Sequence, residues 1–413
     1  MTTVLLIVIY LVFISLGLPD SLIGTAWPAI SASLNIDESF QGFITSAISL
    51  CTIISSFFSI YIIRKLKTSG TIVLSIGLTV LGLVLFTLMP NFYLLFIACI
   101  PLGLGGGAID ATLNNYVALH YKALHMNWLH SFWGVGATTS PLIISYFLTN
   151  DINGWRKGGL VLAAIQFSIL LVSILAIPLY KKCEIIFAKR EVQEVKKEEK
   201  AEISILDTFR IRGIFFALFG FLAYTSVESL TGMWFSSYVH FGLTNTDGSA
   251  LVSEAQAAKW GSFFYLGITI GRFISGLLSL KIKEKNMIRI GEVIIAIGIV
   301  LLSINVNLSI ILLPISIVLI GLGCAPIYPA IIKDTPNRFT STYSQNVMGI
   351  QMSFAYISNF IIAPAFGFIA KATSFIYLPY FIIAFFLLLV FGNEGINFKI
   401  KYYKGDILKL KTK

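Results

Sequence analysis

The chain has 413 residues, of which 56% are hydrophobic and only 12% are charged, and its mean hydropathy is +0.85. A soluble domain carries about 25% charged residues, so this composition excludes a soluble protein and indicates an integral membrane protein. The apolar stretches are long enough for membrane-crossing helices, which need about twenty residues each, and too long for the strands of a barrel. Four scattered cysteines without CxxC spacing indicate neither a disulfide framework nor a metal site.

Twelve apolar stretches are predicted to cross the membrane as helices. In chain order they cover roughly residues 3–30, 39–62, 71–89, 92–119, 127–148, 158–180, 210–241, 255–280, 287–304, 308–332, 341–370 and 374–392. The first stretch lacks the basic start and the cleavage site of a signal peptide, so we expect it to remain in the protein.

One polar segment divides the twelve stretches into six and six. We therefore expect an N-terminal six-helix bundle over 1–180, a cytoplasmic linker over 181–209, a C-terminal six-helix bundle over 210–392 and a basic cytoplasmic tail over 393–413. The linker mixes charges of both signs, which is typical of a solvated connection or a surface helix.

The 30 Lys and Arg residues are distributed unevenly along this map. The linker, the other even-numbered loops and the tail hold 25 of them, and the odd-numbered loops hold four. Because positively charged loops stay in the cytoplasm, both termini are predicted to be cytoplasmic, in a multi-pass protein of the cell membrane. This placement also accounts for the net charge of +10 without a nucleic-acid partner, since a basic tail beside a bilayer meets anionic lipid. We expect a monomer.

Three short patterns recur in the same order in both halves. They pair Asp20-Ser21-Leu22-Ile23-Gly24 with Glu228-Ser229-Leu230-Thr231-Gly232, Gly103-Leu104-Gly105 with Gly321-Leu322-Gly323, and Pro141 with Pro364. Chance is the alternative, because these residues are common in membrane helices. Duplicated halves are a transporter architecture, in which the substrate site lies near the midplane between the halves.

Several longer stretches carry a resemblance to a known family. They are 103–114, 126–141, 224–234, Gly271-Arg272 and 321–329. On these residues the chain resembles the Major Facilitator Superfamily, and within it the fucose:proton symporter family of sugar permeases. The superfamily's Gly-x-x-x-Asp-Arg-x-Gly-Arg-Arg signature reads Ser59–Lys67 here, with basic residues but no Asp. We therefore expect a weaker or differently built charge latch at the cytoplasmic gate.

The resemblance implies an all-α integral membrane fold of twelve transmembrane helices in two pseudo-symmetric six-helix bundles. It also implies alternating access, in which one bundle rocks against the other around a central site. In the resembling sugar permeases, acids in helices 1 and 4 carry the coupled proton, and Asp20 and Asp110 occupy matching places.

Three carboxylates fall within the predicted helices, at Asp20, Asp110 and Glu228. A charge in hydrocarbon costs several kcal/mol, and a low-dielectric site favours the neutral form of a carboxyl group. All three are therefore predicted to take part in proton coupling, with hydrogen bonding between helices as the alternative. Asp110 has no acidic counterpart in helix 10, so the coupling is predicted to be asymmetric. Asp110 would cycle its proton, and Asp20 would act as a gate or hydrogen-bond partner.

Polar and aromatic side chains in the helices are the predicted substrate contacts, because amides suit sugar hydroxyls and rings stack on a pyranose. They are Trp27, Asn114, Asn127, His130, Trp133, Tyr224, Trp234, Gln351 and Asn359. For the aromatic residues, anchoring at the membrane interface is the alternative. Arg272 is the one basic residue inside a predicted helix, and we expect a structural charge paired with Glu228 or Glu292.

The predicted function is secondary active transport of a small polar solute, a sugar, coupled to protons. Efflux of amphipathic drugs or metabolites on the same fold is an alternative, and a non-transporting membrane sensor is another. The sequence offers no nucleophile–base pair, no metal-ligand spacing and no ATP-binding motif. We therefore expect no catalytic residue, no metal and no cofactor.

Overall fold

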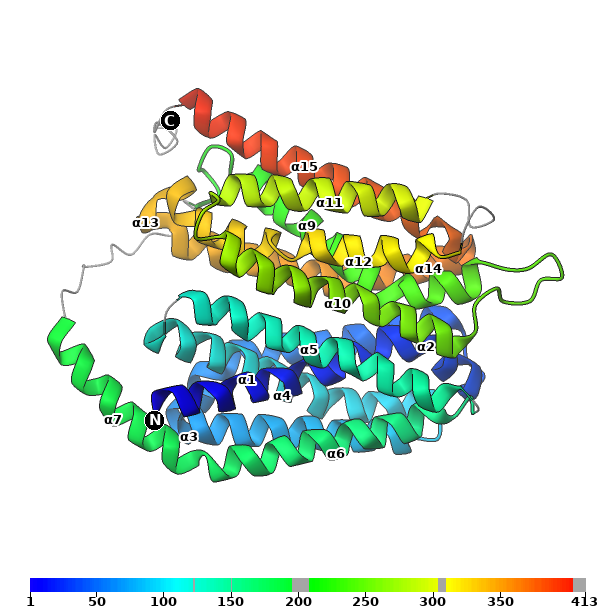
Figure 1. Cartoon of the computed structure of the whole chain (residues 1–413), viewed down its shortest axis with the longest axis horizontal. Coiled ribbons are helices and arrows are strands. Elements are labelled where there is room, and N and C mark those ends of the chain that lie inside the picture. The colour runs from blue at the N-terminus through cyan, green and yellow to red at the C-terminus, as the bar shows by residue number, and fades with distance from the viewer. Residues whose placement is uncertain (122, 150, 195–207, 304–309, 404–413) are drawn as a thin grey trace.

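The computed structural model describes residues 1–121, 123–149, 151–194, 208–303 and 310–403. These residues form two groups of helices that lie side by side with their long axes roughly parallel (Figure 1). The N-terminus and the end of the last helix, α15, lie at the same end of the molecule, here called the termini end. The opposite end, where α2 and α14 lie, is called the remote end.

The first bundle contains the elements up to α6, with α7 on its outside. Their bounds are α1 Thr2–Asp20, α2 Leu22–Leu34, the 3-10 turn η1 Glu38–Phe40, α3 Gln41–Leu88, α4 Phe92–His120, α5 Ala123–Leu148, α6 Gly154–Leu175 and α7 Ile177–Glu194. Within α3, Lys67 leaves helical geometry with φ at 61°, so α3 comprises two membrane-crossing helices in succession.

The second bundle begins with α9. Its elements are α9 Ile214–Ser237, the π-turn η2 Tyr238–Gly242, α10 Glu254–Leu278, α11 Glu284–Ser303, α12 Leu312–Cys324, α13 Ile327–Ile357, the π-turn η3 Ser358–Ile362, α14 Ala363–Ala372, the 3-10 turn η4 Phe375–Tyr377 and α15 Leu378–Tyr403.

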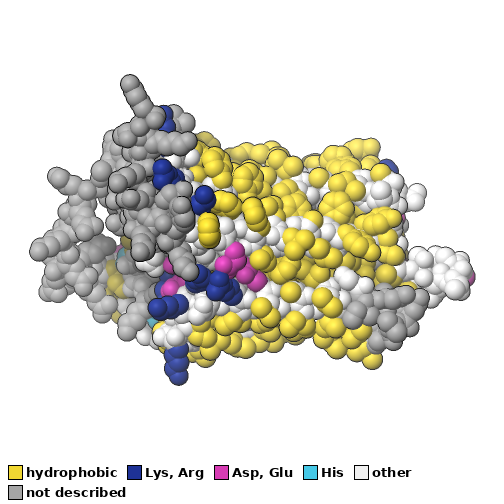
Figure 2. Space-filling model, turned by 90° about the horizontal axis from the view of Figure 1, so that it is seen from above, with side chains coloured by type: hydrophobic (Ala, Val, Ile, Leu, Met, Phe, Trp, Pro, Cys, Tyr) yellow, Lys and Arg dark blue, Asp and Glu magenta, His cyan; other side chains and the backbone are white. Residues whose placement is uncertain are grey.

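Eleven segments among the described residues are long and apolar enough to cross a membrane. The remaining predicted stretch is α5, which is 26 residues long and packs against α1 and α10. The structure thus confirms the predicted all-α fold of twelve membrane helices in two bundles. Figure 2 shows Lys and Arg side chains gathered towards the termini end, with an apolar surface over the length between the two ends. Such a surface suits contact with lipid.

Several observed helix boundaries differ from the predicted ones. The predicted stretch 3–30 is interrupted between α1 and α2 at Ser21, and α13 continues through the loop predicted between 332 and 341. The last helix runs on to Tyr403 because Asn393 and Glu394, which lie past its predicted end, have partners on neighbouring helices. Residues 195–207 of the predicted linker and 404–413 of the predicted tail lie outside the described residues, whereas 181–194 belong to α7 and 393–403 to α15.

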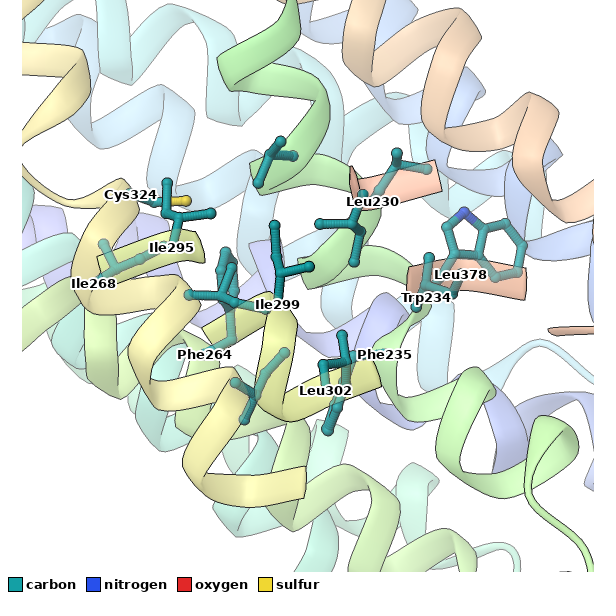
Figure 3. Close-up of a cluster of buried hydrophobic side chains, with 14 of the residues drawn as sticks. Leu230, Trp234, Phe235, Phe264, Ile268, Ile295, Ile299, Leu302, Cys324 and Leu378 are labelled. Carbon is teal, nitrogen blue, oxygen red and sulfur yellow. The ribbon is translucent and has the colours of Figure 1, made fainter. Parts of the chain in front are cut away.

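Each bundle has its own apolar core, built from the inward faces of its helices. In the second bundle the core joins α9, α10, α11, α12 and α15, and its members include Leu230, Phe264, Ile295, Cys324 and Leu378 (Figure 3). All five are almost fully buried. Because close-packed interiors resist deformation, each bundle is suited to move as a unit and to leave a changeable surface between the two.

Candidate transport site

A cavity of about 460 Å³ lies between the two bundles. Residues from α1, α2, α3, α4 and α5 line it on one side, and residues from α9, α10, α13 and η3 line it on the other. The volume falls in the range of small-molecule sites, about 300–1,000 Å³. Its charged or titratable lining residues are Asp20, Asp110, His130, Glu228, Arg272 and three tyrosines.

Asp20 lies at the break between α1 and α2. Pro19 occupies the last turn of α1, and Ser21 separates the two helices. Gly17 lets α1 approach α5 closely, because a Cβ at Gly17 would lie 2.0 Å from the carbonyl oxygen of Trp133. At this separation the Trp133 indole donates from Nε1 to Oδ2 of Asp20 at 2.7 Å. The partner of Asp20 is thus an uncharged donor.

Arg272 extends from α10 of the second bundle and contacts Trp133 of the first bundle. Its Nη2 lies 3.7 Å from Oε1 of Glu228, and its Nη1 donates to the backbone oxygen of His130 at 3.2 Å. The guanidinium carbon also lies 5.1 Å from the ring centroid of Trp133. Of the two predicted partners of Arg272, the structure gives Glu228, whereas Glu292 accepts a hydrogen bond from the Asn393 amide at 3.1 Å.

These contacts form one polar chain across the interface between the bundles: Asp20, Trp133, Arg272, Glu228. The first two residues belong to the first bundle and the last two to the second. Arg272 is only 8% exposed, and its Nε has no hydrogen-bond partner among the described residues. An unpaired buried donor is costly, and Arg272 holds its place between the bundles with this one N–H unsatisfied by any described residue.

Asp110 lies in α4 at a separate part of the cavity wall. Asn114, which lies one helical turn later on the same face of α4, donates from Nδ2 to Oδ1 of Asp110 at 2.9 Å. Among the described residues Asp110 has no ion pair. Asn114 supports Asp110 but does not itself line the cavity.

Of the predicted substrate contacts, His130, Trp133 and Asn359 line the cavity. Trp27 and Trp234 are fully buried instead, and their indoles donate to the backbone oxygens of Glu38 and Ala363. Tyr224 and Gln351 are also buried and do not line the cavity. In this structure these four residues lie within the helix packing; the amide oxygen of Gln351 accepts from Thr335 at 3.3 Å, and the buried Tyr224 hydroxyl has no hydrogen-bond partner among the described residues. The side chain of Asn127 lies outside the described part of the structure.

Several lining residues were missed by the sequence analysis. They are the hydroxyl residues Thr45, Ser49, Thr52, Thr225 and Ser229, and the tyrosines Tyr265, Tyr328 and Tyr356. Ser229 could have been found, because it follows Glu228 in the duplicated pattern. The others carry no sequence signal, since Ser and Thr in membrane helices commonly bond to their own backbone.

The two duplicated patterns meet at the remote end of the cavity. A Cβ at Gly24 would lie 2.7 Å from the backbone oxygen of Gly232, so the corresponding glycines of the two halves are in contact. Nearby, Gln41 donates to the backbone oxygen of Met233 at 2.7 Å, and Lys371 pairs with Asp37 at 2.8 Å. These contacts close the cavity towards the remote end.

The sequence model of the family described as Major Facilitator Superfamily matches residues 9–253 and 251–393. One curated relative is the Saccharomyces cerevisiae "Bypass of stop codon protein 6", which is 26% identical over 66% of this chain and 56% of its own length. Another is the Bacillus subtilis glucose/mannose transporter GlcP, which is 28% identical over 53% of this chain and 52% of its own length. The alignments thus span about half the length of these relatives.

Solved structures share the fold at low sequence identity. A D-xylose–proton symporter has a TM-score of 0.70 at 13% identity and covers 98% of this chain and 97% of its own. An E. coli fucose:proton symporter variant has a TM-score of 0.59 at 14% identity, over 94% and 98%. A POT family transporter in complex with 5-aminolevulinic acid has a TM-score of 0.67 at 16% identity, over 98% and 96%. The shared fold therefore does not select a substrate class.

Proposed function

Because the chain belongs to the Major Facilitator Superfamily and is a multi-pass membrane transporter, we propose that it moves a small polar solute, a sugar, by alternating access coupled to protons. The observation that carries this proposal is the polar chain from Asp20 to Glu228, which crosses the interface between the bundles inside the central cavity. A solute bound there contacts both bundles at once, as alternating access requires.

The chemistry of the cavity supports a hydroxyl-rich solute. Hydroxyl groups of Ser, Thr and Tyr both donate and accept hydrogen bonds, carboxylates accept them, and the Arg272 guanidinium, as a lining residue, is a donor. Sugars present the same mixture of donors and acceptors. The similar proteins include a glucose/mannose transporter and xylose and fucose symporters, which agrees with this class.

Proton coupling is supported by the surroundings of the acids. Glu228 has a cationic partner, whereas Asp20 and Asp110 accept hydrogen bonds from neutral groups only. A carboxyl group without a cation in a low-dielectric site is the kind that exchanges a proton during a transport cycle. We assign the cycling proton to Asp110, and to Asp20 the role of hydrogen-bond partner that holds Trp133.

The orientation follows from the charges. With Lys and Arg gathered at the termini end, this end faces the cytoplasm and the closed remote end faces the outside. The protein would then lie in the cell membrane with both termini inside. The conformation would be one in which the outer gate is shut. The division into bundles at 1–180 and 210–392, joined by the linker 181–209, fits this scheme, with the tail 393–413 also cytoplasmic.

A second candidate function is efflux of amphipathic compounds. It is favoured by Met233, Met352, Phe13 and Phe264 in the lining, where Asn359 is the single amide. The sequence predicted four amide side chains as substrate contacts, and among the described lining residues Asn359 is the one amide. Methionine-lined surfaces adapt to varied apolar ligands.

Two measurements separate the candidates. Purified protein is heated with D-glucose, D-mannose, D-xylose, L-fucose or an amphipathic cation, because a ligand that binds only the folded state raises the melting temperature. The stabilising compound is then tested for uptake into proteoliposomes with an imposed inward proton gradient. We expect a sugar to stabilise the protein and to accumulate. Stabilisation by the amphipathic cation alone, with proton-driven extrusion, would replace the proposal by efflux.

A further inference from the structure

The second bundle contains a π-turn that reaches from the cavity to the closed remote end. The turn, η3, covers Ser358–Ile362 between α13 and α14. A single π-helical turn of this kind is rare and occurs often at functional sites. Here Asn359 lines the cavity, and the backbone oxygen of Phe360 faces the first bundle.

The cavity side of the turn is held by a serine of the duplicated pattern. Ser229 donates to Oδ1 of Asn359, and Ser358 donates to Ser229 at 3.4 Å. The position of the Asn359 amide, which can contact a solute, is thus fixed by the residue next to Glu228. These contacts lie entirely within the second bundle.

The other side of the turn is held by the first bundle. Ser46 of α3 donates from Oγ to the backbone oxygen of Phe360 at 3.1 Å. This bond joins two chain segments that are 314 residues apart. Ser46 satisfies a backbone oxygen of the π-turn and at the same time joins the two bundles.

The same faces of α3 and α14 continue outward from this bond. Gly42 lies against Pro364, since a Cβ at Gly42 would be 3.1 Å from the Pro364 Cα. Phe43 and Phe368 have ring centroids 5.0 Å apart, and Asp37 pairs with Lys371 at 2.8 Å. The contacts therefore run antiparallel, from the exposed ion pair at the remote end inward to Ser46. The innermost contact is the bond from Ser46 to Phe360, and Phe360 directly follows Asn359 in the chain.

From this arrangement we infer that the π-turn couples the solute site to closure of the remote end, and that Ser46 is the positioning residue that carries the coupling. This inference deepens the proposed function by naming how the bound solute would be sensed at the gate. A change in the Asn359–Ser229 contact shifts the backbone at Phe360. That shift changes the strength of the hydrogen bond from Ser46 to the Phe360 oxygen, which is the innermost of the contacts between α3 and the segment of η3 and α14.

The test uses the full chain without any sugar, so that it does not depend on the proposed substrate. Hydrogen–deuterium exchange is measured over residues 358–372 for the native protein and for Ser46→Ala, Ser46→Thr and Ser229→Ala. Loss of the Ser46 bond should raise exchange over α14 about fivefold, the equivalent of about 1 kcal/mol. Ser46→Thr keeps the hydroxyl and should restore the native rate.

Ser229→Ala is the decisive variant because it alters only the cavity side of the turn. We expect exchange over α14 to rise in this variant too, as coupling through the turn requires. Ser168→Ala is the matched control, since this serine bonds only to the backbone of its own helix, at Ala164. It should leave exchange over 358–372 unchanged.

Three results would overturn the inference: no rise in Ser46→Ala, an equal rise in Ser168→Ala, or a rise in Ser46→Ala without one in Ser229→Ala. Sugar uptake kinetics form a second arm. Ser46→Ala should raise KM about fivefold, the same factor, and Ser46→Thr should restore it; an unchanged KM would contradict coupling. If the native protein transports no sugar, the proposed function fails, and the exchange results alone decide the inference.

Discussion

Asp20 and Glu228 occupy corresponding places in the duplicated pattern, yet their carboxylates have different partners. Glu228 lies 3.7 Å from the Arg272 guanidinium, whereas Asp20 accepts a hydrogen bond from the neutral indole of Trp133 at 2.7 Å. The second bundle therefore gives its acid a cationic partner, and the first bundle gives its acid a neutral one. The two acids occupy matching places in the repeated pattern, and the residues on α5 and α10 give them different partners.

The different partners of the two acids also suggest different roles in the site. A paired acid fixes the local electrostatics, and an acid with neutral partners is free to change its protonation state. Asp110, whose partner is the Asn114 amide, belongs with Asp20 in this respect. The predictions below test this contrast between an acid paired with a cation in the second bundle and acids with neutral partners in the first.

The largest effect is expected for Arg272→Gln. It leaves Glu228 without its cation in a mostly buried site, which costs about 3 kcal/mol of unfolding free energy. The double variant with Glu228→Gln should recover most of the loss, because no charge then remains unpaired. Thermal unfolding in detergent measures both. If the double variant is no more stable than Arg272→Gln, the two side chains are not energetically paired.

A smaller loss is expected for Trp133→Phe, which keeps an aromatic ring beside Arg272 but removes the donor to Asp20. A hydrogen bond to a charged acceptor contributes about 1.5–3 kcal/mol. Because the Trp133 indole is an uncharged donor, we expect its bond to Asp20 to contribute near the lower value. Trp128→Phe is the control, because Trp128 makes an aromatic contact with His125 and does not line the cavity. Equal melting temperatures for the two variants would show that the Asp20 contact does not stabilise the fold.

The fold was predictable from the sequence because apolar length and charge placement act over whole helices. The three acids and Arg272 were predictable for a related reason, since charge inside an apolar stretch is conspicuous. The break at Ser21 and the π-turn at Ser358 were not, because single-residue irregularities depend on contacts with other helices. The buried positions of Trp27 and Trp234 were not predictable either, since a tryptophan beyond an acid suits packing as well as a cavity wall.

The two glycines that end the duplicated pattern should also behave differently. Gly24→Ala places a methyl group 2.7 Å from a backbone oxygen of the other bundle, whereas in Gly232→Ala it lies 2.9 Å from the tip of the Tyr265 side chain. Overpacking costs about 1–3 kcal/mol, and a side chain yields more easily than backbone. Gly24→Ala should therefore open the remote end and Gly232→Ala should not.

Spin labels at Asn153→Cys and Thr373→Cys, with Cys51 replaced by Ser, measure this opening as a distance between the bundles. We expect a longer-distance population in Gly24→Ala alone. The same distribution in both variants, or a longer distance only in Gly232→Ala, would show that the glycine contact does not close the remote end.

The smallest effect is expected for Asp37→Asn, which removes the exposed ion pair with Lys371. Exposed pairs contribute about 0.2–1 kcal/mol, and the Lys371 side chain is 54% exposed. Burial alone would raise the pKa of Asp37, but hydrogen bonds from Lys371 and Ser39 outweigh it and hold that pKa below its usual value. The pair is thus complete above about pH 4 and is lost as the pH falls through this lowered pKa.

Because the Asp37–Lys371 pair stays intact between pH 5 and pH 8, it should not make the opening of the remote end depend on pH in this range. The same spin-label distance, recorded over this range at low and high salt, checks the expectation. A large opening in Asp37→Asn, comparable to that of Gly24→Ala, would mean that the ion pair and not the inner contacts holds the gate.

The most direct test of proton coupling measures proton and sugar movement together in proteoliposomes. A pH-sensitive dye inside the vesicles reports protons while labelled sugar is added outside. We predict that sugar entry acidifies the interior for the native protein. Asp110→Asn should still exchange sugar across the membrane but should neither acidify the interior nor accumulate sugar against its gradient. Acidification in Asp110→Asn equal to that of the native protein would contradict the account.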